Sequence, residues 1–190
     1  MRVAALIALC LLTAGCGLGP LDATQSGGDR VRPAALLHVL PSPGDLRGPD
    51  AAAAGADDLQ TAWTGVPDPA LAERITQLEP SAAAVRTWAD PRGGEMVATV
   101  SVWDSHLTAT QVGADLATRL TDAGAAAWTP SQVRGSRGAR LDTNRRREVR
   151  LGYAIGPNAL YVRATGSVSD GTVIKTMARL IAALPGQLEK

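Results

Sequence analysis

Three adjacent polar residues, Asp104, Ser105 and His106, have the side-chain types of a hydrolase triad. In such a triad the serine is the nucleophile and the histidine the general base, and the members normally come from separate segments. Immediate neighbours rarely converge in that way, so we predict a polar turn between a strand and a helix. The segment 135–138, Gly-Ser-Arg-Gly, is one residue short of the G-x-S-x-G nucleophile motif. We therefore predict no catalytic residues and no enzymatic activity.

Residues that bind metals or phosphate groups are also scarce. His38 and His106 are the two histidines, and Cys10 and Cys16 are the two cysteines. A structural zinc site needs about four suitably spaced ligands. No glycine-rich segment of the sequence ends in Gly-Lys-Ser or Gly-Lys-Thr, the P-loop signature. The sequence thus predicts neither a metal site nor a cofactor.

Arginine is concentrated in one segment of a chain whose charges otherwise balance. The 190 residues have a formal net charge of +1, which argues against nucleic-acid binding through bulk electrostatics. Guanidinium groups bind phosphate in a bidentate manner, so the arginine-rich segment 134–150 is a candidate contact for anionic headgroups or phosphate-bearing wall polymers. We assign this contact to its last four arginines: Arg145, Arg146, Arg147 and Arg150. The alternative is a solvated strand face that pairs with the acidic segment 22–79.

The N-terminus combines a positive charge, an apolar run and a cysteine. Arg2 precedes the run 3–12. This run has about half the length of a membrane-spanning helix and is typical of a signal peptide. Ala14 and Gly15 come directly before Cys16, and this ending resembles the lipobox of bacterial lipoproteins.

The resemblance to the lipoprotein family implies a lipid anchor. A signal peptidase would cleave between Gly15 and Cys16, and the Cys16 thiol would carry a diacylglycerol group. Thr13 stands where the lipobox usually has leucine, and Cys10 falls within the removed peptide. The alternative is an ordinary secretory signal in which Cys16 is incidental. With abundant Ala and Gly, little Lys and no Phe, the chain resembles the small uncharacterised lipoproteins of GC-rich bacteria.

We divide the chain into four parts. Residues 1–15 are the predicted lipoprotein signal peptide, and 16–33 are the lipidated cysteine with a flexible polar tether. Residues 34–80 form a predicted N-terminal segment of loops and helical turns, and 81–186 the folded core domain. Within the third part, 41–56 is rich in Pro, Gly and Asp, and Asp68-Pro69 is a helix-start signal.

The core domain is predicted to be α+β, with a largely antiparallel sheet. Alternating apolar residues and turn signals indicate strands over 83–89, 95–103, 139–143, 147–155 and 160–164, and a short one at 125–128. Amphipathic helices are expected from Thr108, with Gln111 in the capping-box position, and from about Asp170. We write the order as β-β-α-β-β-β-α and expect both helices to pack on one face of the sheet.

These features favour a membrane-anchored extracytoplasmic lipoprotein with a non-catalytic interaction, scaffold or sensor role. Its expected partners are the membrane, through lipid on Cys16, and a protein of the cell envelope. The alternative is a carrier of a small ligand or lipid, with an envelope hydrolase as a distant third. A cavity lined by tryptophans would favour the carrier, whereas tryptophans packed in a filled core would favour the interaction domain.

Overall fold

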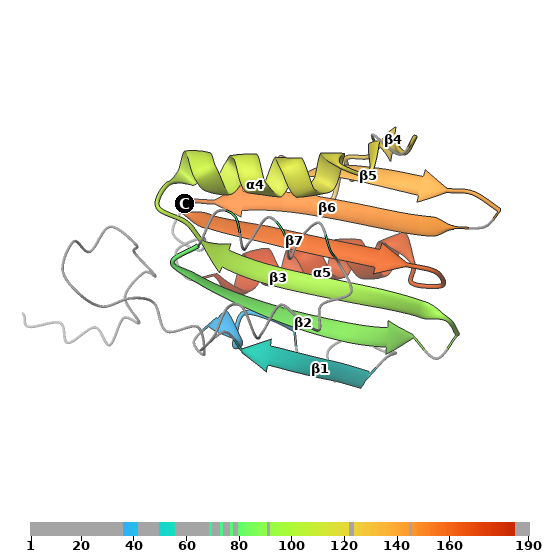
Figure 1. Ribbon diagram of the computed structural model, residues 1–190, viewed down its shortest axis with the longest axis horizontal. Coiled ribbons are helices and arrows are strands. Elements are labelled where there is room, and N and C mark those ends of the chain that lie inside the picture. Colours follow the sequence, from blue (N-terminus) through green and yellow to red (C-terminus); the bar gives the residue numbers. More distant parts are fainter. Residues whose placement is uncertain are drawn as a thin grey trace, which may run out of the picture.

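The computed structural model describes residues 36–41, 50–55, 69, 73, 77, 80–90, 92–121, 124–144 and 146–184. They form a seven-stranded sheet in the order β1-β2-β3-β7-β6-β5-β4, together with two α-helices (Figure 1). The strands are β1 Asp50–Gly55, β2 Ala82–Asp90, β3 Gly94–Val102, β4 Ala126–Ala127, β5 Arg137–Asp142, β6 Arg147–Ile155 and β7 Asn158–Thr165. The helices are α4 His106–Thr118 and α5 Asp170–Ala183. Each neighbouring pair of strands is antiparallel, so the predicted α+β class is confirmed.

Tight turns join consecutive strands where the sequence predicts them. Gly93, with a φ of 93°, lies in the β2–β3 turn, and Gly156, with a φ of 52°, begins the β6–β7 turn. Glycine adopts such positive φ values without the steric cost that a Cβ atom imposes. The short strand predicted at 125–128 is β4, and with it the order from β2 onward is β-β-α-β-β-β-β-α, one strand more than in the order that we wrote.

The prediction that both helices lie on one face of the sheet is wrong. Figure 1 shows α4 in front of the sheet and α5 behind it. Alternate residues of β3 and β7 enter two separate cores, because successive side chains of a strand point to opposite faces. Val162 belongs to the core under α5, whereas Tyr161 belongs to the core under α4. Both faces of the central strands are apolar, so each needs its own cover.

The two cores differ in size and composition. The core under α5 is the larger, and Met96, Val100, Leu160, Met177 and Leu180 are all nearly inaccessible to solvent within it. The core under α4 is built mainly of small side chains, with Trp103 and Tyr161 as its largest members.

Part of the segment before residue 81 also packs against the sheet. Leu36, Val39 and Leu40 are buried in the core under α5. Asp50–Gly55, which we predicted to be part of a loose stretch, forms edge strand β1 and pairs with β2. Pro69 is helical, as its start signal indicates, and so are Glu73 and Gln77. The predicted signal peptide and tether, residues 1–33, lie outside the described part of the chain.

Each helix begins at a serine that caps it. The Ser105 hydroxyl accepts a hydrogen bond from the Thr108 amide at 3.1 Å, and the Ser169 hydroxyl accepts one from the Thr172 amide at 3.2 Å. The predicted start at Thr108 is therefore two residues late, because the preceding serine satisfies the amide that a cap must satisfy. The predicted start of α5 at Asp170 is confirmed.

Candidate functional site

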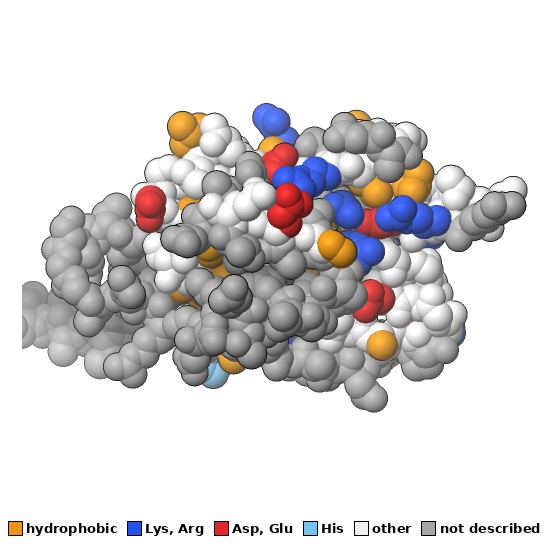
Figure 2. Space-filling model, in the orientation of Figure 1, with side chains coloured by type: hydrophobic (Ala, Val, Ile, Leu, Met, Phe, Trp, Pro, Cys, Tyr) orange, Lys and Arg blue, Asp and Glu red, His pale blue; other side chains and the backbone are white. Residues whose placement is uncertain are grey.

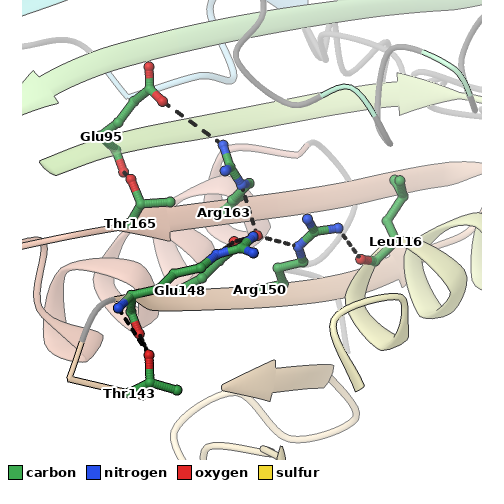
Figure 3. A network of polar contacts seen from close by, with 8 residues as sticks. Glu95, Leu116, Thr143, Glu148, Arg150, Arg163 and Thr165 are labelled. Carbon is green, nitrogen blue, oxygen red and sulfur yellow. Dashed lines mark hydrogen bonds and ion pairs between the residues drawn. The ribbon is translucent and has the colours of Figure 1, made fainter. Parts of the chain in front are cut away.

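A buried carboxylate lies at the centre of a polar cluster on the α4 face of the sheet. Glu148, on β6, is fully buried and accepts hydrogen bonds from Arg150 at 2.7 Å and Arg163 at 3.0 Å (Figure 3). Arg146 also donates to it. Arg163 is in turn 3.9 Å from the Glu95 carboxylate on β3. We call Glu148 and these three arginines the Glu148 cluster.

Strand geometry brings the cluster together. Glu148 and Arg150 are two residues apart on β6, so their side chains point to the same face. Arg163 lies directly across from Arg150 in the register of β6 and β7. The end of α4 closes the cluster, where the Leu116 carbonyl accepts a hydrogen bond from Arg150 at 3.4 Å.

The electrostatics of the cluster keep Glu148 ionised. Burial raises the pKa of its carboxyl, but the hydrogen bond from Arg150 and the charge of Arg163 outweigh burial. With further hydrogen bonds from Arg146 and Arg163, the pKa falls to about 2. With this pKa the carboxyl stays ionised near neutral pH, where it accepts hydrogen bonds and pairs with cations. Its chemical role is to hold three cations against the sheet.

The four arginines assigned to anion contact do not share one surface. Arg150 is buried in the Glu148 cluster, and Arg146 contacts the same carboxylate from a more exposed position. Arg147 directly precedes Glu148 on β6, so its side chain points to the opposite face of the sheet. It donates to the carbonyls of Gly166 and Val168 and pairs with Asp170 at the start of α5. Arg145 lies outside the described residues. The acids that pair with Arg146, Arg147 and Arg150 among the described residues are Glu148 and Asp170, which are their neighbours in the fold.

Two other arginines of the same segment are exposed. Arg134 lies in the loop before β5 and Arg137 is the first residue of β5. Neither forms an ion pair with any residue that the structure describes. Arg140, the next along the strand, pairs with Asp142 and Asp170, both at 3.0 Å. Only the tertiary structure separates the arginines that form ion pairs from those that form none among the described residues, because all of them share one run of sequence.

The surface beside α4 carries charges of both signs. Figure 2 shows Lys or Arg and Asp or Glu side chains intermixed over β6 and β7, next to the end of α4. Over β6 and β7 the acidic side chains compensate part of the positive charge of the arginines. We call Arg134 and Arg137, which have no acidic partner in the described residues, the β5-edge arginines.

Asp104, Ser105 and His106 form a turn and a helix start, as the sequence analysis predicts. Ser105 caps α4, and the His106 Nδ1 atom is 2.9 Å from the Gly156 carbonyl oxygen. The Asp104 carboxylate accepts a hydrogen bond from the Ser81 hydroxyl at 3.5 Å. Each side chain thus has a partner of its own outside a triad arrangement.

Metal-ligating side chains do not gather in the described part of the chain. No group of three His, Cys, Asp or Glu residues there is placed to hold a metal ion. Neither helix among the described residues is long and apolar enough to cross a membrane.

No family model matches the sequence, and no curated protein matches it significantly. Among solved structures, the fold is similar to the extracellular domain of PknH from Mycobacterium tuberculosis. The TM-score is 0.42 and the identity 10%, over 83% of this chain and 98% of that domain. Similarity at this level carries no inference about function.

Proposed function

We propose that this chain is a bacterial lipoprotein, held by lipid on Cys16 at the extracytoplasmic face of the membrane, with a non-catalytic recognition domain. The anchor rests on the sequence, where the apolar run ends in Ala14-Gly15-Cys16. Two acyl chains on one protein give stable attachment, whereas a single chain is marginal. The folded domain would then act next to the membrane.

The packing of the tryptophans argues against a carrier whose cavity these side chains would line. Trp88 is fully buried in the core under α5, and Trp103 is 2% exposed in the core under α4. Trp128 packs against the larger core from a partly buried position. These side chains fill the interior, so they do not line a ligand cavity.

The exposure of the β5-edge arginines is the observation that carries the recognition role. Arg134 and Arg137 present two guanidinium groups to solvent without an acidic partner in the described residues. Arginine is favoured at interfaces because its planar group binds carboxylates and phosphates in a bidentate manner. The partner that we propose is an envelope protein with an acidic surface.

Replacing the lipidated cysteine tests the anchor. Cys16→Ser should abolish labelling by a fatty-acid analogue and release the protein from the membrane fraction. Cys10→Ser is the matched control and should remain labelled and membrane-bound, because the residue lies in the removed peptide. Membrane attachment of Cys16→Ser equal to that of the native protein would refute the anchor.

Crosslinking in the native membrane tests the recognition role. The lipidated protein should capture a protein partner in stoichiometric amounts, and Arg134→Ala/Arg137→Ala should capture at least about tenfold less, as expected for lost interface arginines. Lys175→Ala, which removes an exposed charge from α5, should capture as much as the native protein. Equal capture by the double variant would overturn the assignment to these arginines. Recovery of the protein with lipid or wall polymer alone would overturn the choice of a protein partner.

A further inference from the structure

A groove of about 500 Å³ lies on the α5 side of the sheet, far from the β5-edge arginines in the strand order. Residues 37–41 and Arg86 of β2 line it, together with Arg179 and Ala183 near the end of α5. Figure 1 draws residues 36–41 as a blue segment near β1 and β2. Sites for small molecules commonly have volumes of about 300–1,000 Å³, so the groove is large enough for one.

Apolar and basic side chains share the lining of the groove. Leu37, Val39, Leu40, Pro41 and Ala183 provide apolar contacts. The charged or titratable members among the described lining residues are His38, Arg86 and Arg179. Apolar walls with cationic groups match a ligand that has an alkyl chain and an anionic end.

Arg86 provides the strongest indication of an anion. Its neighbours on the same face of β2, Ala84 and Trp88, belong to the core under α5, so the Arg86 side chain starts from an apolar surface. Its Nη1 donates to the carbonyl oxygens of Leu40, at 3.3 Å, and Pro41.

The charge of Arg86 has no acidic partner among the described residues. Its Nε is buried without an acceptor. No carboxylate among the described residues pairs with Arg86. A half-buried cation without a counter-ion is unfavourable, and an anion within reach offsets that cost.

We propose that this groove binds an anionic amphiphile, with its carboxylate or phosphate on Arg86 and its alkyl chain along residues 37–41 and the end of α5. The same chemistry is found in a free fatty acid and in a monoalkyl phosphate. The inference goes beyond the recognition role and is independent of the anchor, since it uses neither Cys16 nor the β5-edge arginines. Loss of either proposal leaves the other standing.

Titration with defined probes tests the groove. The full chain with Cys16→Ser, which carries no acyl group of its own, is titrated with dodecyl phosphate, dodecanoate, dodecanol and inorganic phosphate. Both anionic amphiphiles should bind at least about tenfold more tightly than dodecanol or inorganic phosphate. Equal binding of inorganic phosphate would reduce the site to a free-anion site and overturn the proposal, and so would equal binding of dodecanol.

Three substitutions locate the bound anion. Arg86→Met keeps the apolar stem and should weaken dodecyl phosphate binding at least about tenfold. Ala183→Glu places a carboxylate in the groove without altering Arg86, and it should weaken binding as much. Ala182→Glu is the matched control, because residue 182 is exposed and does not line the groove. If Arg86→Met fails to fold, native affinity in Ala183→Glu would by itself overturn the assignment.

Discussion

At the residue scale, Glu148 is the most deeply buried charged residue in the described part of the chain. Its carboxylate is fully buried and contacts three arginines from β6, β7 and the turn before β6. Removing one member of a buried ion cluster leaves the others without compensation, which costs more than the cluster contributes in the intact protein. Glu148 therefore stabilises the fold mainly by compensating the charge of these three arginines.

Substituting this carboxylate should destabilise the protein strongly. Glu148→Gln removes the buried carboxylate that Arg146, Arg150 and Arg163 share, and we expect a loss of about 3–5 kcal/mol in the free energy of unfolding. Denaturant titration measures the loss. The control Glu73→Gln removes an exposed ion pair with Arg119, and its loss in the free energy of unfolding should stay below about 1 kcal/mol. Equal losses in the two variants would contradict the role of burial.

The same carboxylate should also make stability depend on acid. Its pKa is lowered from 4.5 to about 2 in the folded state, so the folded protein binds this proton less readily than the unfolded chain. The stabilisation is complete above the unfolded value of 4.5 and is lost as the pH falls towards 2. The stability difference between the native protein and Glu148→Gln should therefore shrink across this range. A difference that is constant from pH 6 to pH 2 would contradict the lowered pKa.

At the element scale, α4 approaches the sheet closely because two glycines meet. A Cβ atom on Gly152 of β6 would lie 2.1 Å from the Gly113 carbonyl oxygen of α4. At this distance the atoms overlap, so the backbones of β6 and α4 would have to move apart. A Cβ atom on Gly113 would lie 3.5 Å from the Tyr153 carbonyl oxygen, an ordinary contact. The strand position, and not the helix position, therefore requires glycine.

The two glycines should respond differently to alanine. Gly152→Ala forces α4 away from β6, and we expect a loss of about 1–3 kcal/mol, as for overpacked cores. Gly113→Ala introduces no severe contact and should gain up to about 1 kcal/mol, since alanine favours a helix over glycine. Thermal or chemical unfolding of both variants decides the matter. Gly113→Ala as destabilising as Gly152→Ala would show that the close approach has been assigned to the wrong element.

At the scale of the whole molecule, a single sheet separates two cores. β3 and β7 contribute alternate residues to each core. Loss of either core would therefore expose one apolar face of these two strands. Two cores that share the same strands are expected to unfold together as one cooperative unit.

Cavities made in either core should therefore lower the midpoint of the same unfolding transition. Leu116→Ala under α4 and Leu180→Ala under α5 should each cost about 2–5 kcal/mol. Because the two side chains lie on opposite faces, their costs should add within about 0.5 kcal/mol in the double variant. Tryptophan fluorescence and far-ultraviolet circular dichroism should give one common midpoint. Separate midpoints for the two probes would mean that the cores unfold independently.

Local features of the fold were predictable from the sequence. Alternation of apolar residues located β2, β3, β6 and β7, because a strand repeats every two residues along the chain. The start of α5 was predictable because its cap and its apolar stripe lie within a few residues of each other. Strand β1 was missed because its run of alanines between Asp50 and Gly55 has no alternation to detect.

The candidate site was only partly predictable. The common face of Glu148 and Arg150 follows from their spacing, and so does the opposite face of Arg147. Arg163 joins the cluster through the register of β6 with β7, which depends on the turn between the strands and not on the spacing of residues within either strand. The exposure of Arg134 and Arg137 likewise depends on where other elements place their acids.

The sequence by itself determined the strands that follow β1, the two helices and the proposed anchor at Cys16, because each depends on neighbours along the chain. The tertiary structure alone decided which face each helix covers, which arginines are paired, and that Arg86 opens onto a groove. These depend on contacts between segments far apart in sequence, such as residues 37–41 with β2 and the end of α5. Such contacts arise from the packing of both faces of the sheet, which no short stretch of sequence encodes.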